Sequence, residues 1–266
     1  MRPTLFTIGS LPIRSYEVMV AIGFLIALYF AVRRARKKNI PFRFMLDLGL
    51  CVLISGFIGA RIYYILQHIR SYDSLADIFS RIWEGGLTYY GGLVLASLVG
   101  FIYLRSRRLP IVGMMDIAAP SLALGEGISR IGCFLAGCCF GKPTDLPWGV
   151  TFPKNSLTGI LTDSQKVHPT QIYSSIILFS IFIILIVLQR HTKFSGQLFL
   201  IYLVMYSIYR FFIDFLRYYT PEEHLGILAY SQVTSLVLGS VALIVMIWRL
   251  WFSPFSKTEK DSGQPD

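Results

Sequence analysis

Residues 111–144 read IVGMMDIAAPSLALGEGISRIGCFLAGCCFGKPT, an apolar segment that runs directly into a stretch rich in cysteine and glycine. The apolar part, Ile111–Ile128, has about the length that crosses the hydrocarbon core of a bilayer. Arg130 stands at its edge, and three of the 4 cysteines lie within residues 133–139. This stretch predicts a membrane span whose end carries a polar, sulfur-containing site.

The composition of the rest of the chain agrees with a membrane protein. Apolar residues make up 54% of the 266 positions and charged residues only 15%, more apolar surface than a soluble domain of this size can bury. We therefore expect an all-α polytopic membrane protein with seven transmembrane helices. The expected spans are Tyr16–Val32, Met45–Leu66, Leu87–Leu104, Ile111–Ile128, Gln171–Leu188, Leu198–Leu216 and Leu225–Trp248.

The net charge of +10 is concentrated in alternate loops. Of the 25 basic residues, 14 follow the first, third, fifth and seventh expected spans. The positive-inside rule then places the N-terminus outside and the C-terminus in the cytoplasm. We read these clusters as topological signals and expect no nucleic-acid partner. Residues 1–251 should form one membrane domain, followed by a disordered cytoplasmic tail, residues 252–266.

The same topology places three polar segments on the outer side of the membrane: residues 67–86, residues 129–170 and the short loop around Pro221. The second is about 42 residues long, and loops of such length tend to be functional. Its glycines and prolines predict a folded cap built from turns, without a further helix.

Ionisable residues inside the spans are the candidates for chemistry. Tyr206, Arg210, Asp214 and Arg217 follow one stripe of the sixth expected span. An arginine at the bilayer centre costs about 2.5–3.5 kcal/mol even on insertion scales, so it should face a wet cavity or a partner. An Arg210–Asp214 pair that only holds helices together is the alternative. Asp214, however, can neutralise only one guanidinium. Glu126 would have to reach round a helix turn to serve Arg130.

A second arginine, Arg61, follows Gly56 and Gly59, which would admit another helix or a ligand at close range. Arg61, Arg130, Arg210 and Arg217 are all expected in the outer halves of their spans. Converging guanidiniums bind phosphate in a bidentate manner, and at this depth the obvious anion is a lipid phosphate.

The cysteines and one histidine allow several interpretations. Because a zinc site would need better spacing and more ligands, we expect no metal at Cys133, Cys138 and Cys139. A disulfide among them and simple packing both stay open. His168 either caps the next span or takes part in chemistry.

Several of these motifs resemble the bacterial prolipoprotein diacylglyceryl transferases. That family's signature is approximately Gly-Arg-x-Gly-Asn-Phe-(aliphatic)-Asn-x-Glu-x-x-Gly. This chain keeps Arg130, Gly132, Phe134, Leu135 and Gly141, and departs at Ser129, Cys133, Ala136 and Cys138. A cysteine-rich version of the signature looks like a branch of the same family.

The resemblance extends in order from about Ile13 to Arg217. It includes residues 146–150, the run from His168 to Tyr173, and a tyrosine in the first span that matches Tyr16. A Gly-Gly-(apolar)-x-x-His-Gly-Gly motif appears as residues 85–92, with Tyr90 where a histidine often stands. The family's tyrosine, arginine and acid in the sixth span match Tyr206, Arg210 and Asp214.

The resemblance implies transfer of a diacylglyceryl group from phosphatidylglycerol to the lipobox cysteine thiol of a prolipoprotein, with release of glycerol phosphate. It implies no cofactor and a cytoplasmic (inner) membrane location, with the active site facing the outer side of the bilayer. Arg130 and Arg210 would bind the phosphate and stabilise the leaving group, and the enzyme's own cysteines would not be nucleophiles. The catalytic candidates are Arg130, Arg210, His168 and Tyr90, and the substrate-binding candidates are Tyr16, Arg61, Gly91, Gly92, Gly132, Gly141, Tyr206 and Asp214.

The base that activates the acceptor thiol stays open, because tyrosine, with an ordinary pKa of about 10, is a poor base near pH 7. His168 could serve, Tyr90 could be helped by arginines, or the thiol could ionise without a base. Two other functions also stay open: a related transferase with another acceptor, and a lipid or solute transporter. A transporter usually shows paired half-repeats with broken helices, and we find none in the sequence.

Overall fold

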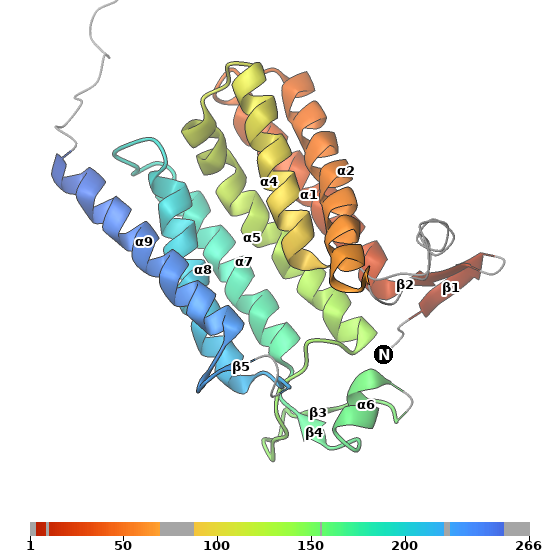
Figure 1. Cartoon of the computed structure of the whole chain (residues 1–266). Coiled ribbons are helices and arrows are strands. Elements are labelled where there is room, and N and C mark those ends of the chain that lie inside the picture. Colours follow the sequence, from red (N-terminus) through yellow and green to blue (C-terminus); the bar gives the residue numbers. More distant parts are fainter. Residues whose placement is uncertain (1–3, 9–10, 70–87, 155, 221–223, 253–266) are drawn as a thin grey trace, which may run out of the picture. The chain divides into compact units, whose positions relative to one another are not determined.

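The computed structural model describes residues 4–8, 11–69, 88–154, 156–220 and 224–252, and over these ranges the chain consists mainly of long helices (Figure 1). The helices are α1 (Ser15–Arg36), α2 (Phe42–Gln67), α4 (Tyr89–Ser106), α5 (Ile111–Ala136), α6 (Leu157–Leu161), α7 (Thr170–Leu188), α8 (Gln197–Leu216) and α9 (Tyr230–Phe252). The strands pair into three antiparallel two-stranded sheets. They are β1 (Thr4–Ile8), β2 (Leu11–Arg14), β3 (Val150–Thr151), β4 (Lys166–Val167), β5 (His224–Leu225) and β6 (Leu228–Ala229).

Six of the described helices are long and apolar enough to cross a membrane: α1, α2, α5, α7, α8 and α9. The expectation of an all-helical, multi-span membrane protein is therefore confirmed. The third expected span corresponds to α4, which has 18 residues. Seven crossings and their orientation stay predictions.

The chain divides into two compact units, and the boundaries between them fall inside α1 and α5. One unit contains residues 28–114, and the other contains residues 1–27 and 115–266.

In the smaller unit, α2 and α4 run antiparallel at close range. A Cβ built on Gly59 would overlap the carbonyl oxygen of Gly91, and one on Gly92 would lie 2.9 Å from the carbonyl oxygen of Gly56. Near the other end of the pair, the Tyr103 hydroxyl donates to Asp47 at 3.3 Å. Small residues let two helix backbones approach in this way, so the glycines before Arg61 admit another helix.

In the larger unit, α7 and α8 provide most of a buried core to which α5 contributes two alanines. The core residues are Ala119, Ala123, Leu178, Ile181, Leu185, Leu198, Tyr202, Tyr209 and Ile213. Asp116 on α5 accepts hydrogen bonds from the backbone N–H groups of Gly196 (2.7 Å) and Phe199 (2.9 Å). Because these N–H groups at the start of α8 have no partner within the helix, the buried carboxylate fixes this end of α8 against α5.

The secondary structure of residues 129–141, which carry the family signature, differs from the sequence-based expectation. We expected a loop from Ser129 onward, but α5 continues to Ala136 and includes Arg130 and Cys133. The helix ends where Gly137 takes a φ of +73°. The N–H of Gly137 then bonds to the carbonyl of Phe134, and that of Cys138 to the carbonyl of Cys133, the two bonds of a Schellman motif. The helix continues through Pro120 and past the expected boundary at Ser129.

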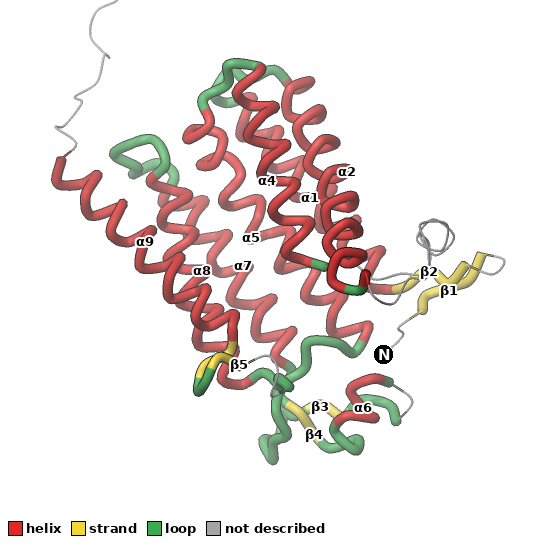
Figure 2. The backbone as a smooth tube through the Cα atoms, in the orientation of Figure 1, coloured by secondary structure: helices red, strands yellow, loops and turns green. Residues whose placement is uncertain are grey.

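The expected cap after α5 is folded, but the expectation that it would lack a helix is wrong. It contains the five-residue α6, whose Ser156 side chain accepts from the N–H of Gly159, and the β3–β4 pair. Loops join these elements (Figure 2). Phe140, Phe152 and Val167 form a small buried core in this segment. Burial of these apolar side chains and the hydrogen bond of Ser156 at the start of α6 stabilise the fold of the segment.

Two further boundaries differ from the sequence-based expectation. The last long helix begins at Tyr230, because Leu225 belongs to the tight β5–β6 hairpin with Gly226 at φ +68°. The β1–β2 hairpin ahead of α1 was not expected. Residues 70–87, which hold Gly85 and Gly86, and the tail from 253 lie outside the described residues.

Candidate active site

Arg130 lies in the last two turns of α5 and pairs with Glu126 on the same helix. An Nη of Arg130 is 2.6 Å from Oε1 of Glu126, and the Tyr206 hydroxyl of α8 donates to the same oxygen at 3.3 Å. We had expected Glu126 to be poorly placed to serve Arg130. That expectation is wrong, because residues four apart on a helix face each other.

Arg210 and Asp214 lie one turn apart on α8, as the sequence stripe indicated. Nε of Arg210 is 3.4 Å from Oδ2 of Asp214, whose side chain is fully buried. Asp214 also accepts hydrogen bonds from the hydroxyls of Tyr219 (2.8 Å) and Ser231 (2.5 Å). Since Ser231 belongs to α9, Asp214 itself links two helices, whereas its pair with Arg210 stays within α8.

Arg217, directly after α8, completes this group. Its Nη1 is 3.8 Å from Oδ1 of Asp214, and its guanidinium carbon lies 5.1 Å from the ring centroid of Tyr219. We had expected Asp214 to serve a single guanidinium, but it is shared between Arg210 and Arg217. Burial raises the pKa of Tyr219 above its ordinary value, so its hydroxyl is a donor at neutral pH.

The three arginines retain unused hydrogen-bond donors. Nε of Arg130, Nη1 of Arg210 and Nε of Arg217 are buried and have no hydrogen-bond partner among the described residues. Arg130 and Arg210 lie close enough for their charges to interact. With Glu126 and Asp214 as the carboxylates, this guanidinium cluster carries one more positive than negative charge. Unpaired buried donors with excess positive charge form a site for an anion.

The other predicted residues of this unit surround the cluster. Tyr16 of α1 is close enough to interact electrostatically with Arg130 and with the three nearby thiols. A Cβ on Gly132 would lie 2.8 Å from Cβ of Met19, so Gly132 lets α1 pack against α5. A Cβ on Gly141 would lie 2.6 Å from Cβ of His168, so this position also requires glycine.

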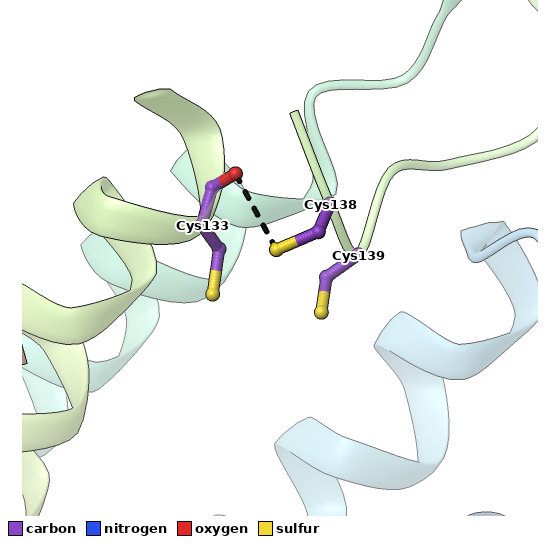
Figure 3. A group of neighbouring side chains, drawn as sticks. All are labelled: Cys133, Cys138 and Cys139. Atoms are coloured by element: carbon purple, nitrogen blue, oxygen red, sulfur yellow. Dashed lines mark hydrogen bonds between the residues drawn. The ribbon is translucent and has the colours of Figure 1, made fainter. Parts of the chain in front are cut away.

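The three cysteines of the signature form a cluster at the end of α5. Their sulfur atoms lie within 4.8 Å of one another, gathered where the chain turns back after the helix (Figure 3). Cys138 Sγ donates to the carbonyl of Cys133 at 3.7 Å, and all three are free thiols. Their linear spacing did not indicate this cluster, because the turn at Gly137 creates it.

The environment of Cys139 favours its thiolate. Hydrogen bonds from Cys133 and Cys138, followed by the charges of Arg217 and Arg130, lower the pKa of the Cys139 thiol below its ordinary value. Arg217 and Arg130 of the guanidinium cluster therefore lie close enough to this sulfur to interact with it.

His168 lies between β4 and α7. Its backbone N–H donates to the carbonyl of Lys142 and its carbonyl accepts from the N–H of Gly141. The centroid of its ring lies 6.3 Å from the ring centroid of Tyr173. The hydroxyl of Tyr173 accepts a hydrogen bond from Nε1 of Trp148 at 2.7 Å. The N-cap position of α7 is Pro169, without a side-chain cap, so His168 does not cap this helix.

The remaining predicted residues belong to the smaller unit. The guanidinium carbon of Arg61 lies 5.5 Å from the ring centroid of Tyr64, and the side chain of Tyr90 is exposed. Gly91 and Gly92 face α2 in the close helix contact described above. Contact of these residues with a lipid stays a prediction.

Two residues of the site were missed from the sequence, Tyr219 and Ser231, and Glu126 was wrongly judged to be poorly placed for Arg130. The spacing already indicated this pair, because i, i+4 is the spacing of a helical ion pair. Ser231 approaches Asp214 through the packing of α9 against α8. Tyr219, five residues after Asp214, reaches it through the turn of the chain after α8.

Comparison with known proteins identifies the family. Residues 3–248 match the family model described as prolipoprotein diacylglyceryl transferase. The chain is 32% identical to the phosphatidylglycerol–prolipoprotein diacylglyceryl transferase of Clostridium tetani, over 92% of this chain and 96% of the relative. It is 34% identical to that of Clostridium botulinum strain Langeland, over 94% and 97%, and 32% identical to that of Finegoldia magna, over 91% and 93%. The chain belongs to the prolipoprotein diacylglyceryl transferase family.

Proposed function

We propose that this chain transfers the diacylglyceryl group of phosphatidylglycerol to the lipobox cysteine thiol of a prolipoprotein and releases glycerol phosphate. The observation that carries the proposal is the guanidinium cluster, with buried unpartnered donors on Arg130, Arg210 and Arg217. A phosphodiester carries one negative charge, which matches the excess charge of the cluster. The relatives, named for this reaction, favour it over a different acceptor or a transport function.

In the proposed reaction, the acceptor thiolate attacks the glyceryl carbon next to the phosphate. The S–C bond forms as the C–O bond breaks, and the electron pair leaves with the phosphate oxygen. Arg130 and Arg210 donate to the phosphate as this charge develops, which lowers the barrier most where water is excluded. Glu126 and Asp214 hold the two guanidiniums in place, and Tyr16 and Tyr206 are proposed to position the lipid.

Transfer can be measured with the purified full-length chain in phosphatidylglycerol vesicles and a synthetic lipobox peptide. Mass spectrometry should show the peptide gaining one diacylglyceryl group, with glycerol phosphate released in equal amount. A peptide with serine in place of the lipobox cysteine is the matched control and should not react, since a hydroxyl is a much weaker nucleophile than a thiolate. Absence of transfer by the folded chain would refute the proposed function.

We also propose seven crossings of the cytoplasmic membrane, with the N-terminus and the guanidinium cluster on the outer side. At 1.5 Å per residue, the 18 residues of α4 span about 27 Å, close to the thickness of the hydrocarbon core. Its antiparallel contact with α2, which is itself long enough to span, supports a crossing. Seven spans also bring the basic clusters to one side.

Labelling of intact cells tests this orientation. A membrane-impermeant maleimide should label a Lys154→Cys variant above the level of the parent chain. It should leave an Arg107→Cys variant at the parent level, because Arg107 follows α4 on the proposed cytoplasmic side. The reverse pattern would overturn the topology.

A further inference from the structure

The three-cysteine cluster has a geometry that packing alone does not require. Cys133 belongs to the last turn of α5, and Cys138 and Cys139 return toward it after the left-handed Gly137. All three sulfur atoms lie within 4.8 Å of one another, and the thiols are free. Cys133 is buried, whereas Cys138 and Cys139 are partly exposed, so the cluster is open on one side.

The backbone holds the cluster in place. The first turn of α7 provides two side chains that fix the turn: Gln171 Nε2 donates to the carbonyl of Cys138 at 2.7 Å, and Thr170 Oγ1 to that of Cys139 at 2.8 Å. Cys139 has a φ of +58°, a conformation that glycine adopts far more readily than cysteine. Sparsely populated backbone conformations of this kind cluster at functional sites.

Three converging sulfur atoms are the ligands of a soft metal ion. Zinc binds thiolates at about 2.3 Å, which places tetrahedral ligands about 3.8 Å apart, so the sulfurs need move by only about 1 Å. Hard cations such as Ca²⁺ and Mg²⁺ prefer oxygen ligands. Zinc sites with three protein ligands leave a fourth position for water or a substrate. We propose that Cys133, Cys138 and Cys139 bind one Zn²⁺ ion whose fourth position takes the thiol of the acceptor peptide.

This inference rests on the proposed function, and it provides the missing activation of the acceptor. A thiol that coordinates zinc loses its proton, here to water, so no side chain has to act as a base at neutral pH. The coordinated sulfur then forms the S–C bond as glycerol phosphate leaves, and the thioether product, which has no charge, releases the metal. Three thiolates and Zn²⁺ carry a net charge of −1, and Arg130 and Arg217 lie close enough to interact with it.

The metal content of the purified full-length chain tests the site. After expression with zinc and purification without chelators, elemental analysis should find one zinc per chain. A Cys139→Ser variant should retain less than about a tenth of it, because it loses one of three ligands. Cys51→Ser, a matched substitution in α2 outside the cluster, should bind zinc like the parent. A folded parent that is zinc-free, holds copper instead or carries a disulfide among the three cysteines would overturn the proposal.

Cobalt tests the role of the fourth position without any measurement of turnover. In chain loaded with Co²⁺, a lipobox peptide should increase the sulfur-to-cobalt charge-transfer absorbance, because a fourth thiolate is added. The peptide with serine in place of the cysteine should leave the spectrum unchanged. An unchanged spectrum with the cysteine peptide bound would overturn acceptor coordination.

The transfer assay separates this inference from the proposed function. Transfer by zinc-free chain at the rate of the zinc-loaded chain would refute the metal's role and leave the transferase function intact. A zinc-loaded chain that shows the cobalt response to peptide but transfers nothing from phosphatidylglycerol would support the metal site and refute the proposed function.

Discussion

Replacing Arg210 by lysine separates a phosphate-binding arginine from one that only carries charge. In the structure the three guanidinium nitrogens of Arg210 make different contacts. Nε lies 3.4 Å from Asp214, Nη2 donates to the hydroxyl of Tyr219 at 3.3 Å, and Nη1 has no partner among the described residues. Lysine places all its donors on one nitrogen, which cannot contact Asp214 and an incoming phosphate in the same geometry.

The expected effect follows from the loss of one hydrogen bond to a charged group. Such a bond contributes about 1.5–3 kcal/mol, so if it forms fully only in the transition state, kcat should fall about 10- to 150-fold. The charge is kept, so the lipid should still bind and the protein should still insert into the membrane. The assay is peptide transfer in phosphatidylglycerol vesicles, with the melting temperature measured in parallel.

The matched control is Arg190→Lys, the same substitution at an exposed position after α7, which should transfer like the parent. Arg217→Lys should cost less than Arg210→Lys, because its closest approach to Asp214 is 3.8 Å and an ammonium group can still interact with the ring of Tyr219. If Arg210→Lys kept kcat within about twofold of the parent, the phosphate role would be refuted. Arg210 would then be a packing residue paired with Asp214.

Three further variants test the supporting contacts. Glu126→Gln replaces the charged partner of Arg130 by a neutral one, which should lower the free energy of unfolding by about 1 kcal/mol and reduce transfer; unchanged values would show that Arg130 does not depend on this pair. Gly141→Ala brings a Cβ to 2.6 Å from that of His168, so the melting temperature should fall by an amount equivalent to about 1–3 kcal/mol, and a melting temperature equal to the parent's would contradict this reading. Tyr219→Phe removes a partly buried, hydrogen-bonded hydroxyl and should cost about 1 kcal/mol at pH 7. Burial raises the pKa of Tyr219. Its contribution to the free energy of unfolding is therefore fully present below the ordinary tyrosine pKa of about 10 and is lost only as the pH rises through the higher pKa of the folded state. A stability difference between parent and variant that disappears below about pH 9 would refute this.

The sequence by itself determined the class of protein and the position of its spans. Apolar runs of about 20 residues can satisfy their backbone groups in lipid only as helices, so each expected span lies largely within a helix of the structure. The sequence also predicted that Arg210 and Asp214 lie on one face of a helix, because the helical period determines which residues share a face. The ion pair of Glu126 with Arg130 obeys the same local rule.

Helix ends and close helix contacts were less predictable. The sequence did not show that α5 continues to Ala136. The helix ends at Gly137, which has a left-handed conformation, but any other glycine of the signature could have ended it in the same way. Nor could Gly91 and Gly92 be assigned to a contact with α2, because a glycine admits a helix, a ligand or a turn with equal ease.

Only the tertiary structure decided which side chains meet. Ser231 of α9 reaches Asp214 of α8, and Tyr206 of α8 reaches Glu126 of α5, through helix packing that joins residues far apart in the chain. The three sulfurs come within 4.8 Å because a single turn reverses the chain and the first turn of α7 fixes that turn. Periodicity carries information along one helix, whereas contacts between helices depend on how side chains of different segments fit together, and that is settled only when the whole chain packs.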